Sequence, residues 1–104
     1  MAKTTERKLG LAVMQVLAGR LNGEATVQTL IRHVPSFVNL TAEDQEQSLT
    51  RPNEEVWEQR IRNLKSHSTT AGNVIAEEFV EHVGRGRYRL TEAGRLHLQH
   101  KGLI

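Results

Sequence analysis

The sequence predicts an α+β fold of the winged helix-turn-helix class, with three to four helices and a small antiparallel β-hairpin wing. A basic amphipathic helix is expected at residues 53–67, and a Gly84-Arg85-Gly86 turn joins two short extended segments after it. A capped helix then closes the chain at about 91–101. Helices followed by a two-stranded hairpin and a further helix are the order expected of a winged helix.

The composition fits one domain over residues 1–104, with a modest core, because the chain has 104 residues and 38% hydrophobic content. Cysteine is absent, which excludes disulfides, thiolate zinc sites and cysteine nucleophiles and is compatible with a reducing cytoplasm. No stretch approaches the ~18 apolar residues of a membrane helix, and the first residues are polar where a signal peptide would be apolar. A cytoplasmic protein without a membrane partner is expected.

The net charge of +2 is too small to indicate nucleic-acid binding by itself. Its distribution is more informative, because residues 51–104 hold nine basic against seven acidic residues and residues 1–50 hold five of each. Arg85, Arg87 and Arg89 stand within five residues without an acid. The sequence therefore predicts a positive surface in the second half of the chain.

The helical part is expected at residues 4–67. A first helix is predicted to begin near Thr4 or Thr5 and to stop at Asn22-Gly23, and Thr26 is the predicted N-cap of a second helix that Pro35 ends. The residues between these helices, 24–26, are predicted to form an extended link. Thr41 followed by acidic residues predicts a third, short and acidic helix.

The helix at 53–67, with Asn53 as its predicted N-cap, is the candidate recognition helix. Its apolar residues fall on one face, and its other face offers the side chains that read base edges. The base-edge candidates are Gln59, Arg62, Asn63 and Ser66, and the phosphate candidates are Arg60, Lys65 and His67. The alternative is a solvated surface helix stabilised by pairs such as Glu58 with Arg62. Trp57 is predicted to pack in the core, the alternative being an aromatic that stacks on a base or walls a pocket.

The wing hairpin is expected at about 74–90, with strand-forming residues at 74–76 and 79–80 before the turn. Alternation in Arg87-Tyr88-Arg89-Leu90 places the two arginines on one face and their neighbours on the other. Arg85, Arg87 and Arg89 are expected to reach phosphates or a minor groove, or else to keep an exposed edge soluble. Thr91 is the predicted N-cap of the last helix.

No catalytic chemistry is expected. Of the five histidines only His97 and His100 have helical ligand spacing, and no carboxylate completes them, so neither a metal nor a cofactor is predicted. Paired carboxylates, a nucleophile with its base and a phosphate-binding loop are all missing from the sequence. A binding domain is therefore expected, and not an enzyme.

Three segments together resemble a known family: residues 57–67 (WEQRIRNLKSH), 72–75 (GNVI) and 86–95 (GRYRLTEAGR). They are similar to the Mrr-type N-terminal winged-helix domains and to related domains of modification-dependent restriction endonucleases. The resemblance implies a DNA-targeting module that reads N6-methyladenine in duplex DNA, with Trp57 as a pocket wall beside Arg60, Asn63, Ser66 and His67. These residues hold no nuclease domain like that of the full enzymes, so cleavage is not implied.

The expected partner is thus double-stranded DNA, with adenine-methylated DNA as the preferred target, bound by the helix at 53–67 and the Arg-rich wing. Two alternatives share the fold: a transcription regulator that ignores methylation, and a protein-interaction winged helix with a partner surface at 37–40 and on the acidic third helix. Salt dependence separates DNA binding from an apolar protein contact. The chain is either a freestanding reader or a targeting domain of a larger enzyme.

Overall fold

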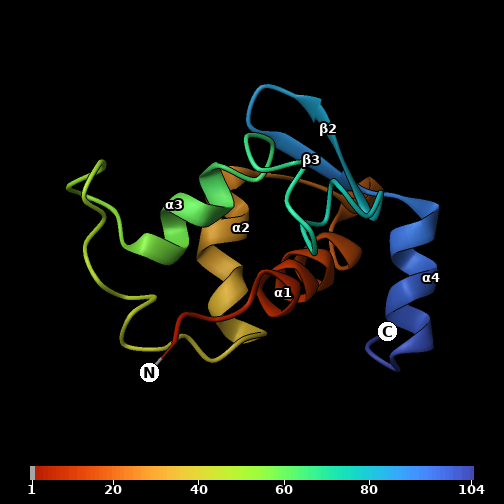
Figure 1. The fold of residues 1–104 in the computed structure, drawn as a ribbon. Helices are drawn as coiled ribbons and strands as arrows, with labels where there is room; N and C mark the ends of the chain where they lie inside the picture. The colour runs from red at the N-terminus through yellow and green to blue at the C-terminus, as the bar shows by residue number, and fades with distance from the viewer. Residues whose placement is uncertain (1) are drawn as a thin grey trace.

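A computed structural model describes residues 2–104 as four α-helices, two 3₁₀ turns and a three-stranded sheet (Figure 1). The elements follow in the order α1 (Glu6–Ala18), η1 (Leu21–Gly23), β1 (Glu24–Thr26), α2 (Val27–His33), η2 (Val34–Ser36), α3 (Val56–Arg62), β2 (Val80–Gly84), β3 (Arg87–Leu90) and α4 (Glu92–His100). This α+β architecture confirms the predicted winged-helix class.

Three threonines begin helices as predicted. The hydroxyl of Thr5 accepts a hydrogen bond from the Lys8 amide (3.2 Å), and Thr26 and Thr91 accept from the third residue of α2 and α4 at 3.3 and 3.0 Å. Each bond satisfies one of the amides that the first turn of a helix leaves without a partner. α1 ends at Ala18, earlier than predicted, and the Asn22-Gly23 pair instead forms the left-handed turn of η1.

The sheet is antiparallel in the order β1-β3-β2, so β3 is the central strand. Residues 24–26, predicted to be only a link, form β1 because they pair with the second edge of β3, where Ala25 lies opposite Tyr88. On the other edge His82 lies opposite Tyr88, with a register shift between His82 and Gly84. Tyr88 and Leu90 are buried and Arg87 and Arg89 exposed, which confirms the predicted alternation.

The core forms around α1, which contacts α2, α4 and the sheet (Figure 1). Its largest fully buried side chains include Leu9, Met14, Leu17, Leu30, Ile61 and Leu98. Each such side chain contributes roughly 1.5–3 kcal/mol by leaving water. Ile61, near the C-terminal end of α3, thereby fixes one face of that helix against α2 and leaves the opposite face outside.

The predicted third, acidic helix is wrong. Thr41 does accept a hydrogen bond from the Asp44 amide (3.1 Å), but only one turn forms. The carbonyls of Asp44 and Glu46 accept from the amides of Trp57 (3.0 Å) and Val56 (2.8 Å). Because these carbonyls bind the start of α3, they cannot continue a helix of their own.

The predicted bounds of the candidate recognition helix and of the first wing strand also need correction. α3 begins after Glu55, whose amide donates to the Glu58 carboxylate (3.0 Å), and not after Asn53. It ends at Arg62 because Leu64 bonds to the carbonyl three residues back, and residues 63–69 continue as turns. Residues 74–78 are turns and not a strand, since the Asn73 side chain accepts from the amides of Ile75 and Ala76.

Candidate nucleic-acid interface

A groove of about 500 Å³ lies between the C-terminal end of α3, the start of α2 and the β2–β3 hairpin. Its lining is Thr26, Val27, Gln28, Arg62, Lys65, Ser66, His82, Arg85, Gly86 and Tyr88. Three of these side chains are basic and none is acidic. We call the groove lined by these residues the wing groove. Its sign of charge suits a polyanion such as the phosphate backbone of DNA.

Contacts between the elements give the wing groove its shape. The Val27 amide donates to the carbonyl of Gly86 (2.9 Å), which holds the hairpin turn against the start of α2. Gly86 has a φ of 65°, a left-handed conformation that favours glycine in this turn. The turn therefore has a fixed position beside α2.

Tyr88 forms the floor of the wing groove. It is buried, and the His82 ring packs edge-on against it with centroids 5.4 Å apart. Burial raises the pKa of Tyr88, and a backbone hydrogen bond with Lys65 offsets part of this increase. The same contact joins the hairpin to the turn after α3, so the two walls of the groove are held together.

Lys65 and Arg85 supply the unpaired positive charge of the wing groove, and Arg62 adds a guanidinium that is paired with a carboxylate. Lys65 and Arg85 are exposed and form no ion pair with any residue between Ala2 and Ile104. Arg62 is paired with Glu54, to which its Nε and Nη2 donate at 2.8 and 2.5 Å. This bond to Glu54 raises the pKa of Arg62 further above its ordinary value.

The other two wing arginines lie beside carboxylates. Arg89 pairs with Glu81 on β2 and lies 3.7 Å from a carboxylate oxygen of Glu24 on β1, and Arg87 lies 3.6 Å from the other oxygen of Glu24. The hairpin arginines have no acid near them in sequence, but the neighbouring strands bring acids to them. Of the three, Arg85 is the one without a carboxylate partner among residues 2–104.

Two predicted site residues lie on the inner side of α3. Trp57 is only 6% exposed and its indole N–H donates to Glu55 (2.9 Å), which confirms the packing interpretation, and it does not line the wing groove. Arg60 donates to the carbonyl of Thr4 (2.7 Å) and to Glu6 (3.1 Å), so it faces the N-terminal segment and not a phosphate. Both side chains fix α3 from its inner side.

The remaining candidates lie along one side of α3 and the turn after it. Gln59 is half-buried and bound by Ser48 and Thr50, and Asn63 is the C-cap of α3. Ser66 and His67 are exposed in the following turn, and of these two Ser66 lines the wing groove. The structure therefore brings Arg62, Lys65, Ser66 and Arg85 together in one groove.

Sequence reasoning missed Gln28, Val27, His82 and Tyr88 as members of this groove. Gln28 and Val27 follow the predicted N-cap Thr26, so their position at a helix start could be predicted from the sequence. Their proximity to the wing could not, because it depends on the pairing of β1 with β3.

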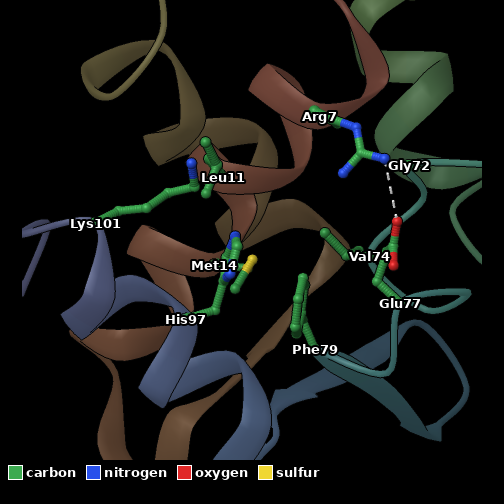
Figure 2. A pocket seen from close by; sticks show the side chains of 9 residues that line it. All are labelled: Arg7, Leu11, Met14, Gly72, Val74, Glu77, Phe79, His97 and Lys101. Atoms are coloured by element: carbon green, nitrogen blue, oxygen red, sulfur yellow. Dashed lines mark ion pairs between the residues drawn. The ribbon is translucent and has the colours of Figure 1, made fainter.

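A second pocket lies between α1, α4 and residues 72–79 and measures about 110 Å³ (Figure 2). Leu11, Met14 and Phe79 give it an apolar lining, the ring of His97 stacks on Phe79 at 4.3 Å, and Arg7 pairs with Glu77 at 3.4 Å beside it (Figure 2). Such a volume holds about four water molecules, and its lining includes the acid Glu77, whereas the wing groove is lined by no acid. The nucleic-acid candidate is therefore the wing groove.

The family model that matches the chain is the Mrr N-terminal domain, over residues 7–100. The chain belongs to the Mrr N-terminal domain family. That domain is the DNA-binding module of Mrr-type restriction enzymes, and these 104 residues hold it without the catalytic nuclease domain. No curated protein and no solved structure showed a significant match. None of the helices formed by residues 2–104 is long and apolar enough to cross a membrane.

Proposed function

We propose that this Mrr N-terminal domain binds duplex DNA with α3 and the turn after it in the major groove and the β2–β3 turn on the backbone. The observation that carries the proposal is the wing groove, where Arg62, Lys65 and Arg85 meet without an acidic side chain in the lining. Phosphate contacts supply most of the affinity and position the protein on the duplex. The polar side chains between them read the bases.

We also propose that the target carries N6-methyladenine. A methyl reader needs an apolar or aromatic wall beside polar groups that bind the adenine edge. In the wing groove Val27, His82 and Tyr88 form such a wall, and Gln28 and Ser66 are the polar groups at its rim. This arrangement replaces the pocket expected beside Trp57, because Trp57 does not line the wing groove. A glutamine amide suits the N6 and N7 positions of adenine.

The experiment is a binding titration with matched duplexes that differ only in one N6-methyl group, across a salt series and several sequence contexts. Burial of one methyl group contributes about 0.8 kcal/mol, so we expect about fourfold tighter binding of the methylated duplex. His82→Ala and Gln28→Ala should reduce this preference, whereas Gln99→Ala, an exposed change on α4, should retain it.

Equal, salt-sensitive binding of both duplexes would instead support the methylation-independent regulator. Binding to no duplex would contradict the proposal altogether. The protein-interaction alternative relied on an acidic third helix, which does not form. In the segment 37–40, Val38 and Leu40 pack partly against the core, so Phe37 is the exposed apolar side chain there.

A further inference from the structure

The connection between η2 and α3 covers residues 37–55, far longer than the three or four residues of a common helix-turn-helix. Connections of this length without secondary structure are uncommon in compact domains, and they are usually either functional or flexible linkers. Its last part, residues 47–55, is a closed loop: Gln47 and Glu55 form an antiparallel bridge, and the Ser48 amide donates to the carbonyl of Glu54 (2.8 Å). "The 47–55 loop" refers to this segment.

Hydrogen bonds fix the 47–55 loop internally and against α3. The buried hydroxyl of Ser48 accepts from the amides of Thr50 (3.3 Å) and Arg51 (3.1 Å). The side-chain amide of Gln59 donates to Thr50 (2.7 Å), and Arg62 is bound to Glu54. The loop therefore has a defined position beside the outer side of α3.

This fixed loop presents an apolar and a basic side chain to solvent. Leu49 is fully exposed, and Arg51 has half of its side chain exposed, with its guanidinium 3.7 Å from Glu54. An isolated exposed leucine is ordinary on a protein surface. Here it stands on a structured loop, two residues from an exposed arginine and next to the candidate interface.

Arg62 connects the loop to the wing groove. A groove of about 480 Å³ is lined by residues 50–54 of the loop and by Arg62, which also lines the wing groove. In Figure 1 the 47–55 loop and the β2–β3 hairpin lie on opposite sides of α3. The exposed side of α3 is thus bordered by the loop at one end and by the wing at the other.

The dimensions suit a duplex. The seven residues of α3 span about 10 Å, and the major groove is about 12 Å wide. A helix of this length placed in the groove brings the elements at its two ends to the two phosphate backbones that border it. Apolar side chains that enter a neighbouring minor groove and press on a base step are a known way of adding contact.

We propose that the 47–55 loop is a second DNA-contacting element, in which Arg51 binds a backbone phosphate and Leu49 packs against the sugars and base edges of the minor groove next to α3. The inference rests on the proposed duplex binding and adds a contact on the side of α3 away from the wing. It also gives the long connection a purpose that a tight turn would not serve.

The test is a fluorescence-anisotropy titration of the full chain with its best-bound duplex over a salt series, using Leu49→Ser and Arg51→Ala. Leu49→Ser should weaken binding by about fivefold or more, which corresponds to a loss of about 1 kcal/mol, with the salt slope unchanged. Arg51→Ala should lower the magnitude of the salt slope by about one. Leu49→Met, which keeps an apolar side chain, should bind like the original chain.

The matched controls are Leu21→Ser and Arg20→Ala, both exposed residues after α1 and outside both grooves. They should leave affinity and slope unchanged. If Leu49→Ser and Arg51→Ala also bind unchanged while Arg85→Ala is weakened, the loop inference is overturned and the proposed function stands. If the original chain binds no duplex, both are overturned.

Discussion

Glu54 holds Arg62 through one carboxylate oxygen, Oε2, which accepts from Nε at 2.8 Å and from Nη2 at 2.5 Å. Its other oxygen, Oε1, is buried without a hydrogen bond among residues 2–104 and lies 3.7 Å from Arg51. Arg62 lines both grooves. The pair therefore sets the direction of the one guanidinium that the wing groove and the 47–55 loop share.

Two substitutions of Arg62 distinguish the contribution of its positive charge to DNA binding from the contribution of its paired guanidinium donors. We expect Arg62→Ala to cost about 1–3 kcal/mol of DNA binding, as for an arginine that reads a base. Arg62→Lys should keep the salt slope and still lose affinity, because an ammonium group does not reproduce the paired donors of a guanidinium. Thermal melting of each variant serves as the control for folding. Full affinity in both variants would show that Arg62 does not touch DNA.

The two wing arginines Arg85 and Arg89 should behave differently. Arg85 has no carboxylate partner among the described residues, so Arg85→Ala should weaken binding to all sequences and reduce the magnitude of the salt slope by about 0.9. Arg89→Ala, which removes an arginine already bound by Glu24 and Glu81, is the matched control with a smaller effect on the slope. Equal slopes for the two variants would contradict the assignment of Arg85 as the phosphate contact.

Local signals in the sequence were enough to predict the helix starts and the faces of β3. The caps at Thr5, Thr26 and Thr91 depend on amides three residues away, and alternation along β3 depends on adjacent residues. The N-terminus of α3 was misplaced by two residues because its start is fixed from outside, by the Glu46 carbonyl. Short-range patterns do not contain that contact.

The role of each arginine was harder to predict for the same reason. Arg60 bonds to the carbonyl of Thr4, 56 residues earlier, and Glu24 reaches Arg87 and Arg89 only because β1 pairs with β3. Helical position alone placed Arg60 beside the exposed face. Which cations remain for a ligand is decided by the tertiary positions of the acids, so the sequence indicated the interface but not its members.

Asp44 should make the fold sensitive to acid. The Asp44 carboxylate is fully buried. Burial raises the pKa of Asp44, but hydrogen bonds from Thr4 and Thr41 lower this pKa by more. The pKa therefore lies below its ordinary value of 3.8. A group with a lowered pKa stabilises the fold above pH 3.8, and this stabilisation is lost as the pH falls through the folded-state pKa. Asp44→Asn should cost about 1.5–3 kcal/mol at pH 7 and flatten stability below pH 4.

Urea unfolding of the original chain and of Asp44→Asn at pH 7, 5, 4 and 2.5 checks this, with the exposed change Glu46→Gln as the control. A loss of stability on acidification that is as steep in Asp44→Asn as in the original chain would show that other carboxylates are responsible.

Gly94 permits the close approach of α4 to the sheet. A Cβ at this position would lie 2.2 Å from the carbonyl oxygen of Phe79, a backbone atom that no rotamer change can move. Gly94→Ala should therefore lower the free energy of unfolding by about 3 kcal/mol. Gly19→Ala, where the nearest atom is 3.7 Å away, is the control and should change it little. Chemical denaturation of both variants gives the comparison.

The most direct test of the central claim is an amide chemical-shift map of the chain during titration with duplex DNA. The account predicts that the largest shifts fall on residues 26–28, 62–66 and 82–87, around the wing groove, while α4 and the pocket of Figure 2 change little. Shifts centred on α4 and α1, with the wing groove unchanged, would contradict it.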